Sequence, residues 1–523
     1  MSKQDNPVAL FVAFAVTAGL VVAGLTVFGV SLPFFPTRSS SPSVGRSTDN
    51  KDLQTLTILG DSFSGYSTFR HPDFQTTLEQ VGIDINYETE VNRTKRADRL
   101  GQDADIWLTT LDRFLIGQPE GKIVGIVDRT VGGDGVVLNT LRYPNLKSLP
   151  DLQTLVEAEA KKGNKLSVAY TADSPSEYIG LVLDTKFEGF NLSDLNLIET
   201  NDASEALNLL NSAGENVAVA ILWEPFVTQA QRQGHTLVLS SEDAPKSILD
   251  VIVASDRLIE TQPAMLSDFL EAYYRRIDTN VRDASALQAQ IAEDGDLSAE
   301  DAALVLQGIE FFTAPQSRQW MADDTLKTRI SATAAVLALS GRLDSVPDNP
   351  ANLYTVEPIA IAAENTQTLI DLVRADNPEL ADRLAGQSRA ISPTVTPVSA
   401  QAVKDAPTVG NLDVRGEVKF ETGSAEIAPE GIATLDNLAA EIREFNPNTI
   451  AVRAIGHTSK TGPADVNQQL SEQRAQAVVN YLKGLGLSHN FVAEGKGFST
   501  PLSDISPEDP RQQRTEIRLV RIN

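Results

Sequence analysis

The amino-terminal part of the chain contains a long stretch, Val8 to Phe35, without a charged residue. A stretch of this length can cross a bilayer as a helix, and it has no polar face for the solvent side of a soluble core helix. No small-residue cleavage pattern follows, so we predict an uncleaved signal anchor within residues 1–36. Lys3 precedes the span and favours a cytoplasmic N-terminus. We therefore expect a single-pass protein of the cytoplasmic (inner) membrane, with its bulk in the periplasm of a two-membrane bacterium.

Composition narrows the range of partners. The chain has 44 basic and 70 acidic residues and a formal charge of −26, which disfavours polyanions, so we expect no nucleic-acid partner. There is no cysteine, and the 4 histidines lack metal-ligand spacing. We predict no metal site and no cofactor. Residues 37–53 are rich in Ser and are predicted to form a flexible spacer.

Residues 54–345 alternate short apolar segments with amphipathic ones, which is typical of an α/β fold. The predicted strands are LTILG (56–60), ADIWLTT (104–110), KLSVAYT (165–171), VAVAILW (217–223) and ILDVIVAS (248–255). Ser174 is placed to cap a helix, with Pro175 in its first turn and Glu177 at the capping-box position. Strand ends that meet helix N-termini form a cleft suited to a small polar ligand. For any single Ser or Thr at these positions, the alternative to ligand binding is that the side chain only caps a helix.

The charges near this cleft bear on its ligand. Four carboxylates are candidates to lie there, namely Asp61, Asp134, Glu177 and Glu224. Without basic partners they favour an amine-bearing or zwitterionic ligand, or a phosphate held by hydroxyls and amides, over a bare oxyanion. Arg70 and Arg129 would reverse this expectation if they pointed inward.

Several segments of this region together resemble the periplasmic substrate-binding proteins of the nitrate/sulfonate/taurine ABC-transporter type. They are ADIWLTTLDRF (104–114), DRTVGGDGVVL (128–138), ILWEPFVTQA (221–230) and VIVASDRLIETQPAMLSDFLEAYYRRID (251–278). The resemblance implies a two-lobed type II periplasmic-binding-protein fold that clamps a small polar solute, makes or breaks no bond, and serves an ABC permease. By the same resemblance, the ligand-binding residues are Ser62, Ser64, Tyr66, Thr109, Thr110, Ser174, Ser176, Trp223 and Glu224.

A rival interpretation treats the same region as an enzyme. Gly60-Asp61-Ser62 follows a predicted strand and resembles the nucleophile block of GDSL-type hydrolases. That chemistry needs a histidine base with an Asp three residues before it. The residues at that offset from the histidines are Thr68, Arg232, Ala454 and Gly486. We therefore disfavour the hydrolase and predict no catalytic residue.

Residues 346–411 are predicted to be a helical extension followed by a linker, because ISPTVTPVSAQAVKDAPTVG (391–410) is proline-containing and favours a semi-extended chain. Residues 412–523 then form a compact α+β unit. Its predicted elements are strand VKFET (418–422), helix 430–445 with Ile432 on its apolar face, strands 449–456, 491–495 and 515–522, and a helix that carries Arg474. Val466, Leu470, Arg474, Val478 and Leu482 recur every four positions. The Arg therefore lies within an apolar stripe and needs an anion or a route to water.

This unit resembles the OmpA-like peptidoglycan-binding domain over its whole length. The matching residues are Phe420, Gly423, Ser424, Gly456, His457, Thr458, Gly462, Asn467, Leu470, Ser471, Arg474, Ala475, Gly495, Gly497, Pro501 and Arg514. In that family an Asp after the His-Thr pair and the later Arg together hold the amino and carboxylate ends of diaminopimelate. Here the Asp position is Ser459, and an Asn-Arg-Arg block is replaced at Gln512-Gln513-Arg514.

The resemblance gives Thr458, Ser459, Asn467, Leu470 and Arg474 as the peptidoglycan-binding residues. Because a neutral hydroxyl cannot replace an ion pair to an ammonium, several outcomes stay open: weak wall binding, substitution by Asp465, a protein-interaction role, or an Arg474 that simply pairs with a neighbouring carboxylate. For the whole chain we predict a membrane-anchored solute-binding protein that contacts peptidoglycan and serves uptake or sensing of an anionic or zwitterionic solute of the phosphate, nitrate or sulfonate class. The alternative is a structural linker between inner membrane and cell wall.

Overall fold

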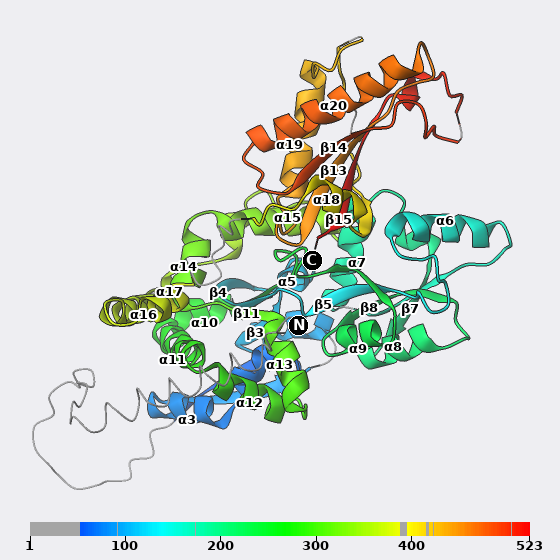
Figure 1. The fold of residues 1–523 in the computed structure, drawn as a ribbon. Coiled ribbons are helices and arrows are strands. Elements are labelled where there is room, and N and C mark those ends of the chain that lie inside the picture. The colour runs from blue at the N-terminus through cyan, green and yellow to red at the C-terminus, as the bar shows by residue number, and fades with distance from the viewer. Residues whose placement is uncertain are drawn as a thin grey trace, which may run out of the picture. The chain divides into compact units, whose positions relative to one another are not determined.

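The structure is a computed structural model that describes residues 53–90, 93–172, 174–386, 395–414, 418–421, 423–503 and 505–522. The predicted signal anchor lies outside these ranges. Within them, no helix combines the length and apolar character needed to cross a membrane. The described chain forms a six-stranded, a five-stranded and a four-stranded sheet, and several of their strands are labelled in Figure 1.

The first lobe combines residues 53–130 with residues 249–345 around the six-stranded sheet, in the order β11-β4-β10-β3-β1-β2. Its strands are β1 (Gln54–Gly60), β2 (Ile83–Thr89), β3 (Ile106–Thr110), β4 (Gly121–Thr130), β10 (Leu249–Ser255) and β11 (Ile309–Phe311). Its α-helices are α2 (Ser67–Arg70), α3 (Pro72–Gln80), α4 (Arg93–Arg99), α5 (Leu111–Gly117), α10 (Asp256–Thr261), α11 (Pro263–Arg282), α12 (Ala284–Asp294), α13 (Ala299–Gln307), α14 (Ala314–Ala322) and α15 (Thr325–Leu339). The rings of Phe69 and Tyr273 stack in its core with centroids 4.4 Å apart, which ties α2 to α11.

The second lobe, residues 131–248, contains the five-stranded sheet in the order β7-β6-β8-β5-β9. Its strands are β5 (Asp134–Leu138), β6 (Ser167–Thr171), β7 (Asn196–Thr200), β8 (Val217–Trp223) and β9 (Thr236–Ser240). Its α-helices are α6 (Leu149–Ala160), α7 (Pro175–Lys186), α8 (Ala203–Asn211) and α9 (Phe226–Arg232). All five strands predicted between residues 54 and 345 are therefore confirmed, and the mixed α/β class is confirmed with them.

The chain crosses between the lobes twice, from β4 to β5 and from β9 to β10. Ser241 ties the two crossings together, because its Oγ accepts hydrogen bonds from the backbone N–H groups of Gly132 (2.9 Å) and Asp134 (3.1 Å). Gly132 has a φ of 130°, a conformation that a side chain would strain. Two adjacent crossings are the arrangement of a hinge. We call residues 241–248 the second crossing.

Residues 346–386 pack on the first lobe. Here α16 (Ala360–Val373) and α17 (Pro378–Leu384) follow two short 3₁₀ turns, at Pro350–Leu353 and Glu357–Ile359. Ile359, Ala362 and Ala363 belong to the core of the first lobe, and the Thr366 hydroxyl donates to the buried Asp278 carboxyl at 2.7 Å. The predicted helical extension is therefore an integral layer of that lobe.

The C-terminal domain is built on the four-stranded sheet, in the order β12-β15-β13-β14. Its elements are α18 (Ala400–Asp405), β12 (Thr408–Asn411), α19 (Pro429–Ile442), β13 (Ile450–Gly456), α20 (Ala464–Gly484), β14 (Phe491–Gly495) and β15 (Thr515–Arg521). The predicted linker is wrong over residues 400–411, because these form α18 and an edge strand. Their β-branched and apolar residues, such as Val403 and Val409, are buried against the sheet rather than extended in solvent.

Three smaller predictions about this domain are also wrong. The segment VKFET forms no strand in its described part, where Phe420 makes only an isolated bridge to Ile427. Ile432 is 39% exposed and Val466 is 54% exposed. Val466 lies in the first turn of α20. The rest of its stripe is inward-facing, and Arg474, Val478 and Leu482 are buried.

Candidate functional site

The hydroxyls predicted from the first polar loop have different environments. Ser62 is exposed and Ser64 is half-buried. Tyr66 is only 2% exposed, and its hydroxyl donates a hydrogen bond to Asp250. Burial, with the nearby charge of Asp250, raises the pKa of Tyr66 well above its ordinary value, so the phenol stays protonated.

The arrangement around Ser62 does not resemble a hydrolase site. In the described chain the histidines bond elsewhere: His71 with Asp73, His235 with Asn211, His457 with Thr500, and His489 with the Phe445 carbonyl. No base is therefore placed beside the serine.

Thr109 and Thr110 lie at the carboxyl end of β3 in the first lobe, and Ser174 and Ser176 lie at the start of α7 in the second. All four are buried. The hydroxyls of Thr110 and Ser176 have no hydrogen-bond partner among the described atoms. Ser174 is the N-cap residue as predicted, but its hydroxyl donates to the Thr171 carbonyl at 2.5 Å and makes no capping hydrogen bond.

Glu177 is not a capping-box residue either. Its carboxylate accepts from Arg113 of the first lobe at 2.8 Å and also pairs with Arg342, which follows α15. The side chains of Glu177 and Arg113 are 7% and 8% exposed. The capping box is therefore replaced by a buried ion pair that joins the two lobes.

Trp223 and Glu224 end β8 and are half-buried. Glu224 caps the start of α9, because its carboxylate accepts from the backbone N–H and the hydroxyl of Thr228 at 3.1 and 2.8 Å. Trp223 lies opposite Asp134 in the β5–β8 register. The segment ILWEPFVTQA, on which the resemblance partly rests, therefore begins within β8 and continues into α9.

Three buried aspartates, Asp128, Asp134 and Asp250, lie on the strands that enter the crossings. Asp128 and Asp250 face each other across the β4–β10 pair and are 0% and 1% exposed. Neither oxygen of Asp128 has a hydrogen-bond partner in the described chain. Burial, reinforced by the charge of Asp250, raises the pKa of Asp128 well above its usual range. Burial raises the pKa of Asp134 to about 8 and that of Asp250 to about 7.

Sequence reasoning missed Asp128 and Asp250. The available signal was an Asp directly beside an apolar run, after IVGIV in GKIVGIVDRT and before VIVA in LDVIVAS. A carboxyl group at such a position must be buried or must bend the strand.

Arg70 and Arg129 do not supply positive charge to this cluster. Arg70 pairs with Asp294, and Arg129 donates to Glu310 at 3.0 Å. Asp61 pairs instead with Arg96 at 3.1 Å. Of the four carboxylates on which the expectation of an amine-bearing or zwitterionic ligand rested, Asp61 and Glu177 are paired with arginines, so that expectation now depends on Asp134 and Glu224.

A groove in the C-terminal domain is lined by Arg474, one of the five predicted peptidoglycan-binding residues. It encloses about 1100 Å³ of space open to solvent. Its lining consists of Val418, Lys419, Phe420, Glu421, Ala428, Glu430, His457, Arg474, Pro510, Gln513 and Arg514.

Arg474 lies in this groove and has only neutral partners. It is 6% exposed, its Nε donates to the Ser424 carbonyl at 2.9 Å, and its Nη1 donates to Gln513 Oε1 at 3.1 Å. The guanidinium carbon lies 5.0 Å from the centre of the Phe420 ring. Burial lowers the pKa of Arg474. No carboxylate pairs with it in the described chain, so an internal ion pair does not account for this residue.

Ser459 and Arg474 are bridged by a single amide. Gln513 accepts from Arg474 through Oε1 and donates from Nε2 to Ser459 Oγ at 3.4 Å. Ser459 is 3% exposed and also hydrogen-bonds the Thr461 hydroxyl at 3.1 Å. Two of the three departures from the family pattern, at positions 459 and 513, therefore belong to one neutral network.

The other predicted wall-binding residues support the loop before α20. Asn467 donates to the carbonyls of Thr461 and Pro463 at 2.9 and 3.0 Å. The Thr458 backbone donates to the Gly497 carbonyl at 2.8 Å, Leu470 is half-buried, and Asp465 is exposed and does not line the groove.

Glu516 is the strongest acid beside the groove. It lies 3.1 Å from His457 Nε2 and 2.7 Å from Arg514 Nη2. Burial opposes its ionisation, but the hydrogen bonds and charges of His457 and Arg514 outweigh burial and hold its pKa at about 2. The Glu516 carboxylate is therefore already paired with His457 and Arg514 and does not pair with Arg474.

Comparison with known proteins assigns the C-terminal domain to a family. Residues 419–515 match the OmpA family. The chain is similar to Outer membrane protein A of Shigella flexneri, with 33% identity over 129 residues, or 24% of this chain and 36% of that protein. It is also similar to Outer membrane protein A of Klebsiella aerogenes, with 36% identity over 97 residues, or 18% and 28% of the two chains. The chain thus spans less than half of either relative, and the match confirms the OmpA-like prediction for this domain.

The chain is also similar in structure to several solved proteins at low sequence identity. The periplasmic aliphatic sulphonate binding protein SsuA from Escherichia coli has 14% identity and a TM-score of 0.43, covering 58% of this chain and 98% of that one. The periplasmic nitrate-binding protein NrtA from Synechocystis PCC 6803 has 15% identity and a TM-score of 0.38, covering 57% and 92%. A mutant of DSZB in complex with biphenyl-2-sulfinic acid has 13% identity and a TM-score of 0.41, covering 60% and 99%.

Proposed function

We propose that this protein is a cell-envelope protein whose C-terminal domain binds a carboxylate of the peptidoglycan peptide, while its two lobes bind a small solute. Arg474 carries the first part of the proposal. A guanidinium that is only 6% exposed and contacts only neutral groups is stabilised by an added anion. A groove open to solvent gives a peptide carboxylate access to it.

The groove also retains negative charge for an amino group. Ser459 is neutral, but Glu421 and Glu430 line the same groove and are exposed. A zwitterionic diamino-acid side chain could therefore place its carboxylate on Arg474 and its ammonium near one of these glutamates. This arrangement is weaker than a family-type Asp, because exposed ion pairs contribute little.

For the lobes, the support is their topology and the acid cluster at the hinge. Two lobes joined by two adjacent crossings can close on a ligand. Burial raises the pKa of the aspartates on the crossing strands, and a nearby ammonium group would favour their ionised form, so we propose an amine-bearing or zwitterionic solute. An anchored protein of this kind would act with an ABC permease or as a sensor. The buried Glu177–Arg113 pair favours a second candidate function, a structural linker between membrane and wall, because it holds the lobes together without a ligand.

Wall binding is tested by retention of the full chain on diaminopimelate-type peptidoglycan. Arg474→Ala is expected to lower the affinity by about 10- to 100-fold, since a charge-assisted hydrogen bond is lost. The control Arg511→Ala removes an exposed guanidinium, 72% accessible, near the groove. Equal retention of Arg474→Ala and the wild type would contradict the proposal.

Ser459→Asp is expected to strengthen retention by restoring a negative group beside the Gln513 amide. Ser459→Asn is the matched control, because it adds similar bulk without charge. If both variants bind like the wild type, the neutral residue at 459 does not limit binding.

Solute binding is tested by a thermal-shift screen of the full chain. Amine-bearing and zwitterionic solutes are expected to raise the melting temperature. At a solute concentration of 100 times the Kd, binding adds about 2.7 kcal/mol to the free energy of unfolding. Nitrate and sulfate are expected to leave the melting temperature unchanged. If no solute raises the melting temperature, the structural linker is the better description.

A further inference from the structure

The C-terminal domain contacts the hinge as well as both lobes. On the second crossing, the Asn446 backbone donates to the Asp243 carbonyl at 2.8 Å, and Lys246 Nζ donates to the Arg443 carbonyl at 3.1 Å. Arg521 Nε lies 3.4 Å from the fully buried Asp243 carboxylate. A segment that must bend for the lobes to move is therefore held from outside the lobes.

The contact with the second lobe is extensive. Lys186 at the end of α7 pairs with Glu441 in the last turn of α19. The Phe187 and Phe445 rings meet edge to face with centroids 5.9 Å apart. Their side chains belong to one continuous core that includes residues of both the second lobe and the C-terminal domain. These two parts therefore move as one body.

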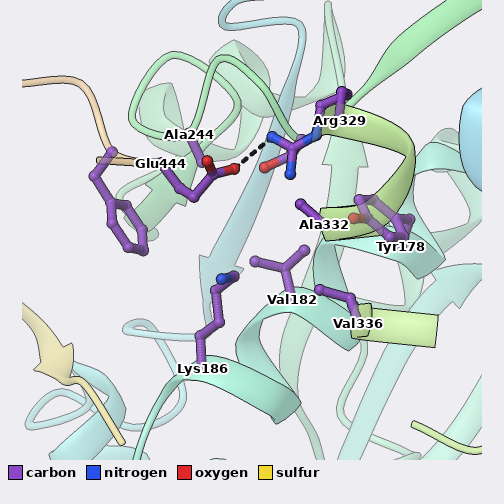
Figure 2. Close-up of a pocket in the computed structure, with 10 residues that line it drawn as sticks. Tyr178, Val182, Lys186, Ala244, Arg329, Ala332, Val336 and Glu444 are labelled. Atoms are coloured by element: carbon purple, nitrogen blue, oxygen red, sulfur yellow. Dashed lines mark hydrogen bonds and ion pairs between the residues drawn. The ribbon is translucent and has the colours of Figure 1, made fainter. Parts of the chain in front are cut away.

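The contact with the first lobe depends on one charged pair. Arg329 of α15 pairs with Glu444, just beyond α19, and also donates to the Lys246 carbonyl at 3.1 Å. The Arg329 side chain is 8% exposed. Figure 2 shows this pair at the edge of a small cavity. Val182 of α7 and Val336 of α15 line the same cavity, one from each lobe. Arg329 thus joins the first lobe, the second crossing and the C-terminal domain.

We infer that the C-terminal domain is a brace across the hinge, which adds the Arg329–Glu444 pair to the Glu177–Arg113 pair in holding the two lobes in one relative position. Opening of the lobes requires the Arg329–Glu444 pair to break, because Glu444 moves with the second lobe and Arg329 with the first. The first turn of helix α19 contains Glu430, which lines the groove, and its last turn contains Glu441, which pairs with Lys186 of the second lobe. The groove and the hinge are thereby connected by a single rigid element.

The inference is tested by measuring the distance between the lobes in the full chain. The sequence has no cysteine, so spin labels at Glu79→Cys on α3 and Ala158→Cys on α6, both exposed, report one inter-lobe distance by pulsed electron paramagnetic resonance. The labelled wild type is expected to give one narrow distance. Glu444→Ala is expected to increase the population of molecules with a second inter-lobe distance by about tenfold, because a hydrogen-bonded charge pair is lost.

Two further variants complete the test. Glu444→Gln keeps the shape and is expected to give an intermediate population, which covers the case in which Glu444→Ala fails to fold. Asp382→Asn breaks an exposed pair with Arg374, 46% and 48% accessible, and is expected to match the wild type. A broad distance distribution in the wild type, or an unchanged narrow one in both Glu444 variants, would overturn the inference. Neither result depends on whether the groove binds peptidoglycan.

Discussion

Asp128→Asn is expected to raise the melting temperature of the full chain at pH 8 by about 5 °C, while leaving it almost unchanged at pH 4.5. In the wild type, burial and the facing Asp250 raise the pKa of Asp128 far above that of an unfolded Asp. The folded protein therefore binds protons that the unfolded chain releases above its ordinary pKa near 4.

The sign of the pH dependence follows from this difference. Where the folded state holds more protons than the unfolded state, the free energy of unfolding falls as pH rises. The window runs from about 4 to the folded pKa values, which are about 7 for Asp250 and about 8 for Asp134. A tenfold difference in proton affinity between the folded and unfolded states corresponds to about 1.4 kcal/mol. The wild type should therefore lose stability through this range, and Asp128→Asn should lose less.

Thermal unfolding at pH 4.5, 6, 7 and 8 provides the measurement. Asp348→Asn serves as the control, because Asp348 is exposed. Parallel curves for the wild type and Asp128→Asn would mean that the carboxyl pair remains hydrated in solution.

The fold of this protein was largely predictable because its signals are local. Strand ADIWLTT and strand TIAVRAIG each show a short apolar run bounded by polar residues, and both are strands in the structure. The linker prediction was wrong for the opposite reason. Thr408–Asn411 pairs with β15, more than a hundred residues later, and nothing within the segment indicates that partner.

In the candidate sites, too, local features could be predicted from the sequence, whereas partners distant in the sequence could not. Arg474 was identifiable as a buried guanidinium from its position in an apolar stripe, but the Gln513 amide that contacts it comes from a different part of the chain. Ser174 was correctly placed at a helix start by the proline that follows it. The partner of Glu177 could not be predicted, since Arg113 lies in the other lobe, far away in the sequence.

Glu177→Gln is expected to lower the free energy of unfolding by about 3 kcal/mol, because it leaves the buried Arg113 guanidinium without the Glu177 carboxylate. Arg113 is 8% exposed, so water does not replace the lost partner. Asp112 lies 3.1 Å from Arg113 Nε and offsets part of this cost. The measurement is the urea midpoint of the full chain at neutral pH.

The chain offers a closely matched control in Glu300→Gln. Glu300 pairs with Arg232 at 3.1 Å, again between the first and second lobes, but the two side chains are 73% and 63% exposed. An exposed pair contributes less than about 1 kcal/mol, so Glu300→Gln should leave the midpoint almost unchanged. Equal effects of the two variants would show that burial does not distinguish these pairs. A large effect of Glu177→Gln alone would mean that the Glu177–Arg113 pair holds the lobes in the arrangement seen here without a solute. A solute would then have to compete with that pair rather than create this arrangement.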